Sequence, residues 1–261
     1  MTNSCGTKFV VLTAQRSGST WFIDILNNCA DATAYTELFL PRKKPRDQRL
    51  MSWKTAEYLD KNLRAYPLFW EAPLSGLTMR PFSVVTYLNE LYRRPGTVGF
   101  KLMYSNLLLY PEVWAYIALH RLPVVHLVRR NHLDVVISEQ MRWTSQTVHR
   151  LVGEPEVAQG QVELNPTDLV KLMRRLRRNI NVARLLLHVC KLPHIEVAYE
   201  ALAQDPHNFD VVCEFLSINR ERRAPQSKLA KLVKGNRSEI IRNYDEVRSA
   251  LMATEFASLL D

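Results

Sequence analysis

The residues with the clearest chemical capability form a short polar loop, QRSGST, at positions 15–20. The loop follows an apolar run at 9–12 and leads into an amphipathic segment that begins at Trp21, so a strand and a helix should flank it. Such a unit points free backbone N–H groups and the positive end of the helix dipole at one place, where an anion binds well. Gly18 permits the tight turn, and Arg16 can hold a doubly charged anion through paired N–H groups. The loop therefore predicts a site for a phosphate or sulfate group.

The loop differs from that of nucleoside-triphosphate-binding proteins, which reads G-x-x-x-x-G-K-[ST]. Ser19 stands where the lysine would follow Gly18, and Thr13 stands where the first glycine would be. The cation of the loop is instead Arg16, which comes two residues before the glycine. Hydroxyl groups add further donors to the loop, on Ser17, Ser19 and Thr20.

A second anion-binding pattern follows another apolar run, at 122–128. Two arginines end that run, and Asn131 is suited to cap a helix that continues from His132. Arg130 would then lie at the end of the strand and Ser138 two turns into the helix. Because ligands of parallel sheets bind at the carboxyl ends of the strands, we expect both side chains to reach one anion beside the first loop.

Together, QRSGSTW and VRRNHLDVVIS resemble the sequences of sulfotransferases that use 3′-phosphoadenosine 5′-phosphosulfate (PAPS), most closely the bacterial and carbohydrate-type enzymes with arginine in the first loop. The resemblance implies that the segment from Arg16 to Trp21 wraps the 5′-phosphate and sulfonate, and that Arg130 and Ser138 bind the 3′-phosphate. It also implies that a late basic segment closes over the 3′-phosphate. The residues assigned to PAPS in this way are Arg16, Ser17, Gly18, Ser19, Thr20, Trp21, Arg130, Ser138, Lys234 and Arg237.

Sulfonate transfer needs in-line positioning, donors that neutralise charge on the transferred and leaving oxygens, and a base for the acceptor hydroxyl. The resemblance assigns the base to Glu37, places Arg16 near the bridging oxygen and brings Lys101 of GFKLMY to the active site. The alternative base is a histidine near the second motif: His120, His126, which suits a buried core position better, His132 or His149. The transfer requires no metal ion, and the sequence holds no cluster with metal-ligand spacing.

Apolar runs predict strands at 9–13, 98–103, 124–128 and 195–197, and helical patterns lie between or after them at 19–28, 111–120, 132–150, 166–189, 206–216 and 238–257. Strands that alternate with helices form a parallel sheet covered on both faces. We therefore expect a three-layer, P-loop-like α/β fold with a central parallel sheet flanked by helices. The length of 261 residues favours a single domain that spans residues 1–261. Within it, we expect residues 36–82 to form an insert on the acceptor side and residues 153–165 to form a mobile loop.

The composition is that of a globular chain, 47% hydrophobic, and its net charge of +9 favours anionic ligands. No apolar run is long enough to span a membrane and no signal peptide is visible, so we expect a cytoplasmic enzyme. The four cysteines have no metal or redox spacing and are expected to be reduced and mostly buried. Apolar residues at 169, 172, 176, 180 and 187 place the arginines at 174, 175, 177 and 178 on the exposed face of a helix.

The sequence thus favours a PAPS-dependent sulfotransferase that acts on a hydroxyl group of a carbohydrate, glycolipid or small metabolite. One alternative is a P-loop small-molecule kinase, which would need the missing lysine and an acid that binds Mg²⁺. The other is a basic nucleic-acid-binding protein, whose affinity would fall steeply with salt. The favoured function predicts no nucleic-acid partner, and the sequence gives no indication of the oligomeric state.

Overall fold

The computed structural model describes residues 6–29, 31–40, 54, 57–58, 61, 63, 66–72, 79–144, 151–153, 161–219, 227–229 and 236–260. Its centre is a five-stranded sheet in the order β2-β3-β1-β4-β5, and every neighbouring pair of strands is parallel. The strands are β1 (Lys8–Thr13), β2 (Ala32–Glu37), β3 (Thr97–Met103), β4 (Val124–Val128) and β5 (His194–Ala198).

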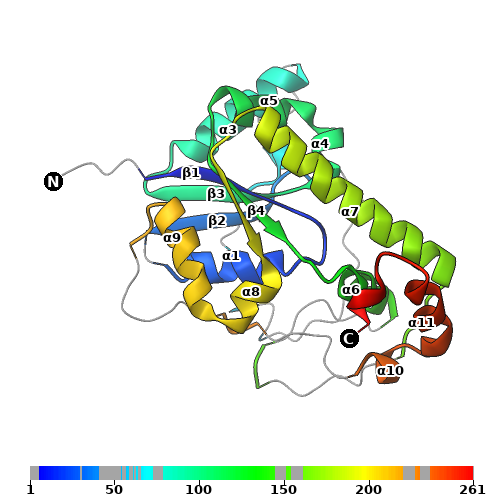
Figure 1. Cartoon of the computed structure of the whole chain (residues 1–261). Helices are drawn as coiled ribbons and strands as arrows, with labels where there is room; N and C mark the ends of the chain where they lie inside the picture. Colours follow the sequence, from blue (N-terminus) through cyan, green and yellow to red (C-terminus); the bar gives the residue numbers. More distant parts are fainter. Residues whose placement is uncertain are drawn as a thin grey trace.

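Helices cover both faces of this sheet (Figure 1). One face carries α3 (Arg80–Tyr92), α5 (Pro111–Leu119) and α7 (Pro166–Val189); the other carries α1 (Ser19–Asn27), α8 (Tyr199–Gln204) and α9 (Asp210–Phe215). The structure therefore has the three-layer α/β architecture with a central parallel sheet that the sequence predicts.

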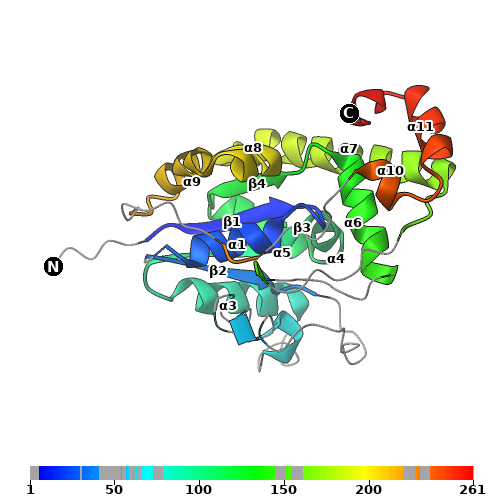
Figure 2. The same cartoon turned by 90° about the horizontal axis from the view of Figure 1, so that it is seen from below.

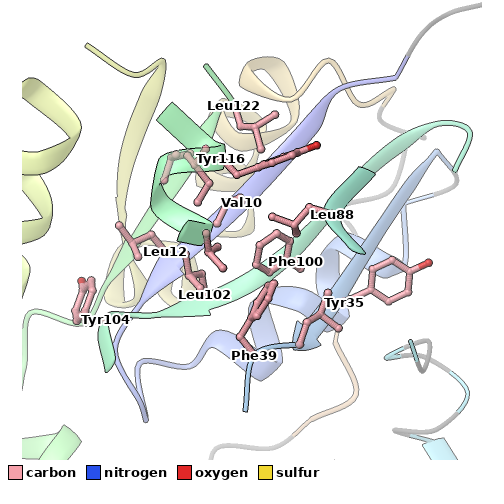
Figure 3. Packing of buried hydrophobic residues seen from close by; sticks show 14 of the residues in the cluster. Val10, Leu12, Tyr35, Phe39, Leu88, Phe100, Leu102, Tyr104, Tyr116 and Leu122 are labelled. Carbon is pink, nitrogen blue, oxygen red and sulfur yellow. The ribbon is translucent and has the colours of Figure 1, made fainter. Parts of the chain in front are cut away.

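The two layers of core follow from side-chain alternation along β1. Val10 and Leu12 pack against the first group of helices, where Phe100 and Leu102 of β3 join them (Figure 3). Phe9 and Val11 point to the opposite face, toward α1 and α9. Because both faces of β1 are buried, its sequence is a continuous apolar run rather than an alternating one.

A third apolar cluster lies beyond the carboxyl ends of the strands, where Figure 2 shows α6 beside the C-terminal helices. It joins α6 (His132–Thr144) and the start of α7 to α10 (Arg237–Ile240), α11 (Tyr244–Met252) and η4 (Ala257–Leu259). The described residues also form η1 (Phe69–Glu71), α4 (Tyr104–Leu109) and η3 (Pro206–Phe209). The C-terminal segment thus packs at the same edge of the sheet as the two motifs that the sequence predicts to bind anions.

Several sequence-based expectations need correction. The strand β2 is not predicted by the apolar pattern, and the helix expected at 238–257 is broken into α10 and α11. Leu172 is 48% exposed rather than inward-facing on α7, although the arginines at 174, 175, 177 and 178 are exposed as predicted. In the segment 153–165, Val162 and Leu164 are buried in the third cluster, whereas 154–160 lie outside the described residues.

The segment expected to be an acceptor-side insert begins within the sheet, because Glu37 is the last residue of β2. Three of its described aromatic residues, Phe39, Tyr66 and Phe69, pack in the core. Phe69 is buried against Phe39 and Tyr87, and Tyr66 packs against Tyr87 as well. Most of 41–78 lies outside the described residues, so the insert stays a prediction.

Candidate functional site

The base of the first loop is closed by buried hydroxyl groups. Thr13, at the end of β1, donates to the carbonyl oxygen of Leu127 in β4 at 2.7 Å, and its Oγ1 lies 2.6 Å from Ser17 Oγ. Ser17 Oγ also donates to the carbonyl oxygen of Ala14 at 2.8 Å and is fully buried. The hydroxyl of Ser17 therefore stabilises the loop from inside, which leaves its backbone N–H as the group that it can offer to an anion.

Arg16 connects the first loop to the second motif. Its backbone is left-handed, with φ of 58°, and its Nε donates to Ser138 Oγ on α6 at 3.0 Å. Ser138 is buried, and its hydroxyl proton remains available for donation. The two patterns that the sequence separates by more than a hundred residues therefore meet, as predicted, at the carboxyl ends of β1 and β4.

Gly18 is the residue from which α1 starts, with φ of 80°. No side chain caps this start, and the first backbone hydrogen bond of the helix runs from the Phe22 N–H to the Gly18 carbonyl. The first turn of α1 contains no acidic residue that would repel an anion. A Cβ atom on Gly18 would stand 2.2 Å from Cδ2 of Tyr199, so only glycine fits beneath this ring. Trp21 packs edge-on against the same tyrosine, with ring centroids 5.6 Å apart.

The arginine pair after β4 divides into one buried and one exposed side chain. Arg129 is 8% exposed and donates to the carbonyl oxygen of Arg16 at 3.2 Å and to the Asp134 carboxylate at 2.9 Å. Its guanidinium also lies 5.0 Å from the centre of the Tyr199 ring, an arrangement that favours a cation–π interaction. Arg130, the residue assigned to the 3′-phosphate, has an exposed side chain.

The start of α6 is already supplied with hydrogen-bond acceptors. Glu200 of α8 accepts from the backbone N–H groups of Arg130 at 3.1 Å and Asn131 at 3.0 Å. The Asn131 side chain accepts from the Asp134 N–H at 3.0 Å, as expected of a helix cap. Any anion held near α6 must therefore be held by side chains, and not by these backbone groups.

Glu37 and Lys101 form an ion pair at the same edge of the sheet. Lys101 Nζ lies 2.7 Å from Glu37 Oε1, and the lysine side chain is 4% exposed. The two residues are paired across β2 and β3, where the register shifts between Tyr35 and Glu37. Lys101 is thus a buried partner of the carboxylate that the resemblance assigns as the base, and it orients that carboxylate at the strand end.

His126 is a buried residue of the core, as the sequence predicts, and its ring is held by hydrogen bonds from both sides. Its Nε2 lies 2.7 Å from the Tyr104 hydroxyl and its Nδ1 lies 3.0 Å from Glu196 Oε2. Arg184 donates to both oxygens of Glu196 at 2.7 Å. Burial lowers the pKa of His126 to about 4, so its ring is neutral near pH 7. Since the carboxylate only accepts, Nδ1 carries the proton and Nε2 accepts from the tyrosine.

Two of the other candidate histidines lie in the described part of the chain, and their rings contact aromatic side chains rather than Glu37 or Arg16. His132 is buried against Phe256, where burial lowers its pKa, and His120 packs against Tyr116 at the far end of α5. His149 lies outside the described residues.

The late basic segment is represented by Arg237 alone, because Lys234 lies outside the described residues. Arg237 Nη2 lies 3.6 Å from Asp134 Oδ1, and Nη1 donates to the carbonyl oxygen of Leu259. Asp134 therefore bridges Arg129 to the C-terminal segment. Among the residues that the structure describes, no group of three or more His, Cys, Asp or Glu side chains is arranged to hold a metal ion. None of the helices in the same residues combines the length and apolar character that a membrane crossing requires.

No family model and no curated protein matches the chain. Solved structures do match it, among them three sulfotransferases. Mouse sulfotransferase SULT7A1, complexed with PAP, is 11% identical with a TM-score of 0.46, and the match covers 97% of this chain and 87% of that one. A sulfotransferase from Alicyclobacillus acidocaldarius is 13% identical with a TM-score of 0.44, over 95% and 94% of the two chains. The sulfotransferase domain from the curacin biosynthetic pathway is 17% identical with a TM-score of 0.44, over 98% and 83%.

Sequence reasoning missed three residues that shape the first loop or the start of α6. The pattern singles out Arg130 rather than its neighbour Arg129, and it gives no weight to Tyr199 or Glu200. The last two directly follow β5, and residues after the strands of a parallel sheet lie at its ligand-binding edge. Their position behind a predicted strand was the signal that could have found them.

Proposed function

We propose that this protein is a sulfotransferase that moves a sulfonate group from PAPS to a hydroxyl group of a carbohydrate, glycolipid or small metabolite. The observation that carries the proposal is the hydrogen bond of 3.0 Å between Arg16 Nε and Ser138 Oγ. It brings two separate anion-binding motifs together. Adenosine 3′,5′-bisphosphate (PAP) is the nucleotide that remains when PAPS has lost its sulfonate group. It carries phosphate groups on two carbons of one ribose, so its binding needs two clusters of hydrogen-bond donors side by side.

The residues around the loop fit the 5′ end of such a nucleotide. Gly18 lies under Tyr199 with no room for a Cβ atom, and α1 begins without a side-chain cap or an acidic first turn. Uncapped N–H groups at a helix start favour a phosphate or sulfonate group. Arg16 adds a positive charge beside them. For the 3′ end, the proposal assigns Ser138 and the exposed Arg130, since the backbone groups at the start of α6 are occupied by Glu200.

Bound PAPS supplies a sulfonate group on a phosphate that leaves readily. Glu37 takes the proton of the acceptor hydroxyl on Oε2, because Oε1 is held by Lys101 at 2.7 Å. Arg16 and the first-turn N–H groups of α1 neutralise charge as it accumulates on the leaving phosphate. Ser17 keeps the loop in shape through its buried hydroxyl.

Thermal-shift measurements with PAP, ATP–Mg²⁺ and oligonucleotides test the proposal, since a ligand of the native state raises the melting temperature. Stabilisation by PAP supports a sulfotransferase. Stabilisation by ATP–Mg²⁺ alone would favour a small-molecule kinase, and stabilisation by oligonucleotides alone a nucleic-acid-binding protein. A mass-spectrometric screen for the gain of one sulfonate, with PAPS and a panel of hydroxylated carbohydrates and metabolites, then identifies the acceptor class.

A further inference from the structure

We propose that Arg129 is a positioning residue that holds the first loop in its anion-binding conformation from behind. Its role is distinct from that of Arg130, the arginine to which the sequence directs attention. The identity of the bound nucleotide rests on the proposed function, whereas the shape of the loop does not. Arg129 acts on the loop through the backbone of Arg16 and through the ring of Tyr199.

The contacts of Arg129 point inward. Its Nη1 donates to the Arg16 carbonyl at 3.2 Å, its Nη2 donates to Asp134 Oδ2 at 2.9 Å, and the side chain is 9% exposed. Its Nε has no hydrogen-bond partner among the described residues. Two of the three guanidinium nitrogens are therefore used to connect a loop carbonyl to a carboxylate on α6.

Arg16 needs such support because its backbone is left-handed. A non-glycine residue with φ of 58° is in an unfavourable conformation that persists only where surrounding contacts determine it. The hydrogen bond from Arg129 to the Arg16 carbonyl is a contact of this kind. The same conformation directs the Arg16 side chain to Ser138. Loss of the bond would let Arg16 relax and would separate the two anion-binding motifs.

Tyr199 extends the same support to the next turn of the loop. The Arg129 guanidinium lies 5.0 Å from the centre of its ring, and the edge of the ring lies against Gly18, where it leaves no room for a Cβ atom. Arg129 and Tyr199 thus fix two residues of the loop that both have positive φ, Arg16 and Gly18. A lysine at 129 would retain one charged donor but not the planar pair of Nη groups.

The experiment compares Arg129→Met with a matched control, Arg121→Met, in binding to PAP and to adenosine 3′-monophosphate. Like Arg129, Arg121 donates to the backbone carbonyl of a residue with positive φ, in this case Lys191 at 2.9 Å, but it precedes β4 at the other edge of the sheet. In Arg129→Met we expect PAP affinity to fall about tenfold or more, with adenosine 3′-monophosphate unaffected, because only PAP carries the 5′-phosphate that the loop holds. Arg129→Lys should recover part of the loss, and Arg121→Met should change neither ligand.

The inference would be overturned if Arg129→Met weakened the binding of both nucleotides equally, or weakened the binding of neither. A second measurement needs no ligand: amide hydrogen exchange of the free protein. In Arg129→Met, amide exchange over residues 15–21 should accelerate about tenfold or more, while exchange in β3 stays unchanged. Arg129→Lys should show a smaller acceleration over the same residues. Failure of the unmodified protein to bind PAP would count against the proposed function alone. Unchanged exchange in the loop would count against the role of Arg129 alone.

Discussion

Lys101 Nζ and Glu37 Oε1 lie 2.7 Å apart, so a buried lysine of β3 holds the carboxylate at the end of β2. The two oxygens of Glu37 therefore have different roles. Oε1 receives the lysine, and Oε2 is left to face the acceptor hydroxyl in the proposed reaction. Lys101 therefore orients the carboxylate that the proposed reaction uses as its base.

Replacement of Glu37 by glutamine tests the base. Glu37→Gln keeps the size of the side chain but removes its capacity to take a proton, so turnover should fall by ~10²–10⁴-fold. PAP affinity should stay within about twofold, because the 5′ and 3′ anion groups do not involve Glu37. Steady-state rates and calorimetric binding measure the two effects. Glu90→Gln, at an exposed ion pair with Arg93, is the control. Full turnover by Glu37→Gln would assign the base to another residue.

Removal of the Ser138 hydroxyl tests the junction of the two motifs. Ser138→Ala deletes the acceptor for Arg16 Nε and a donor to the proposed 3′-phosphate, so PAP affinity should fall about tenfold. Ser83→Ala is the matched control, because Ser83 is a buried serine on α3 whose hydroxyl donates to the Met79 carbonyl at 3.4 Å. Titration calorimetry measures the PAP affinity of both variants. Equal affinities would contradict the assignment of Ser138 to the 3′-phosphate.

A pair of glycine substitutions separates backbone strain from steric clash. Gly18→Ala and Gly153→Ala both place a Cβ on a residue with positive φ, 80° and 89°. Gly153 has open space, so its variant should lose only ~1 kcal/mol of unfolding free energy. Gly18→Ala also meets Tyr199 at 2.2 Å and should lose more stability and PAP binding as well. Urea unfolding measures both, and equal losses would show that Tyr199 does not confine the loop.

Acid should destabilise the protein through His126. An unfolded histidine takes up a proton near pH 6.5, but the folded pKa of His126 is about 4, so the unfolded state binds more protons between these values. Stability should therefore fall by ~3 kcal/mol as the pH drops through this window. Arg184 lowers the pKa of Glu196, and protonation of that carboxylate at lower pH acts in the same direction.

The variant His126→Gln measures that contribution, because an amide can replace both hydrogen bonds without titrating. Urea unfolding from pH 7 to pH 4 should show a smaller slope for His126→Gln than for the parent protein. His207→Gln, at an exposed position, should keep the parent slope. Identical slopes for His126→Gln and the parent protein would contradict the role given to His126.

The unit of β1, loop and α1 was predictable to within a residue at each end. Its strand is apolar on both faces, and its loop contains a glycine where the chain must turn. β2 could not be found in the same way, since ATAYTE has no continuous apolar run; its strand character comes from pairing with β3 and from burial of Ala34 and Tyr35. Glu37 was nevertheless assigned to the site from the family resemblance, and it is the last residue of this strand.

The choice between Arg129 and Arg130 shows where sequence reasoning stopped. Both follow β4 and both are arginines, so their types and spacing are almost equivalent. Which one turns inward depends on contacts from distant parts of the chain: the Arg16 carbonyl, the ring of Tyr199 and the carboxylate of Glu200. The C-terminal helices are a similar case, because Asn243 bonds to the backbone of Leu164 and breaks what otherwise reads as one helix.

The order of the strands also sets which part of the chemistry fails first when the protein is stressed. β1, which carries the proposed nucleotide-binding loop, lies at the centre of the five-stranded sheet between β3 and β4, whereas β2, which ends in Glu37, is an outer strand with one neighbour. Outer strands open by local fluctuation at a lower free energy than central ones. Mild denaturant should therefore abolish turnover while PAP is still bound. A variant designed for turnover at high temperature would first need substitutions that stabilise β2 against local unfolding.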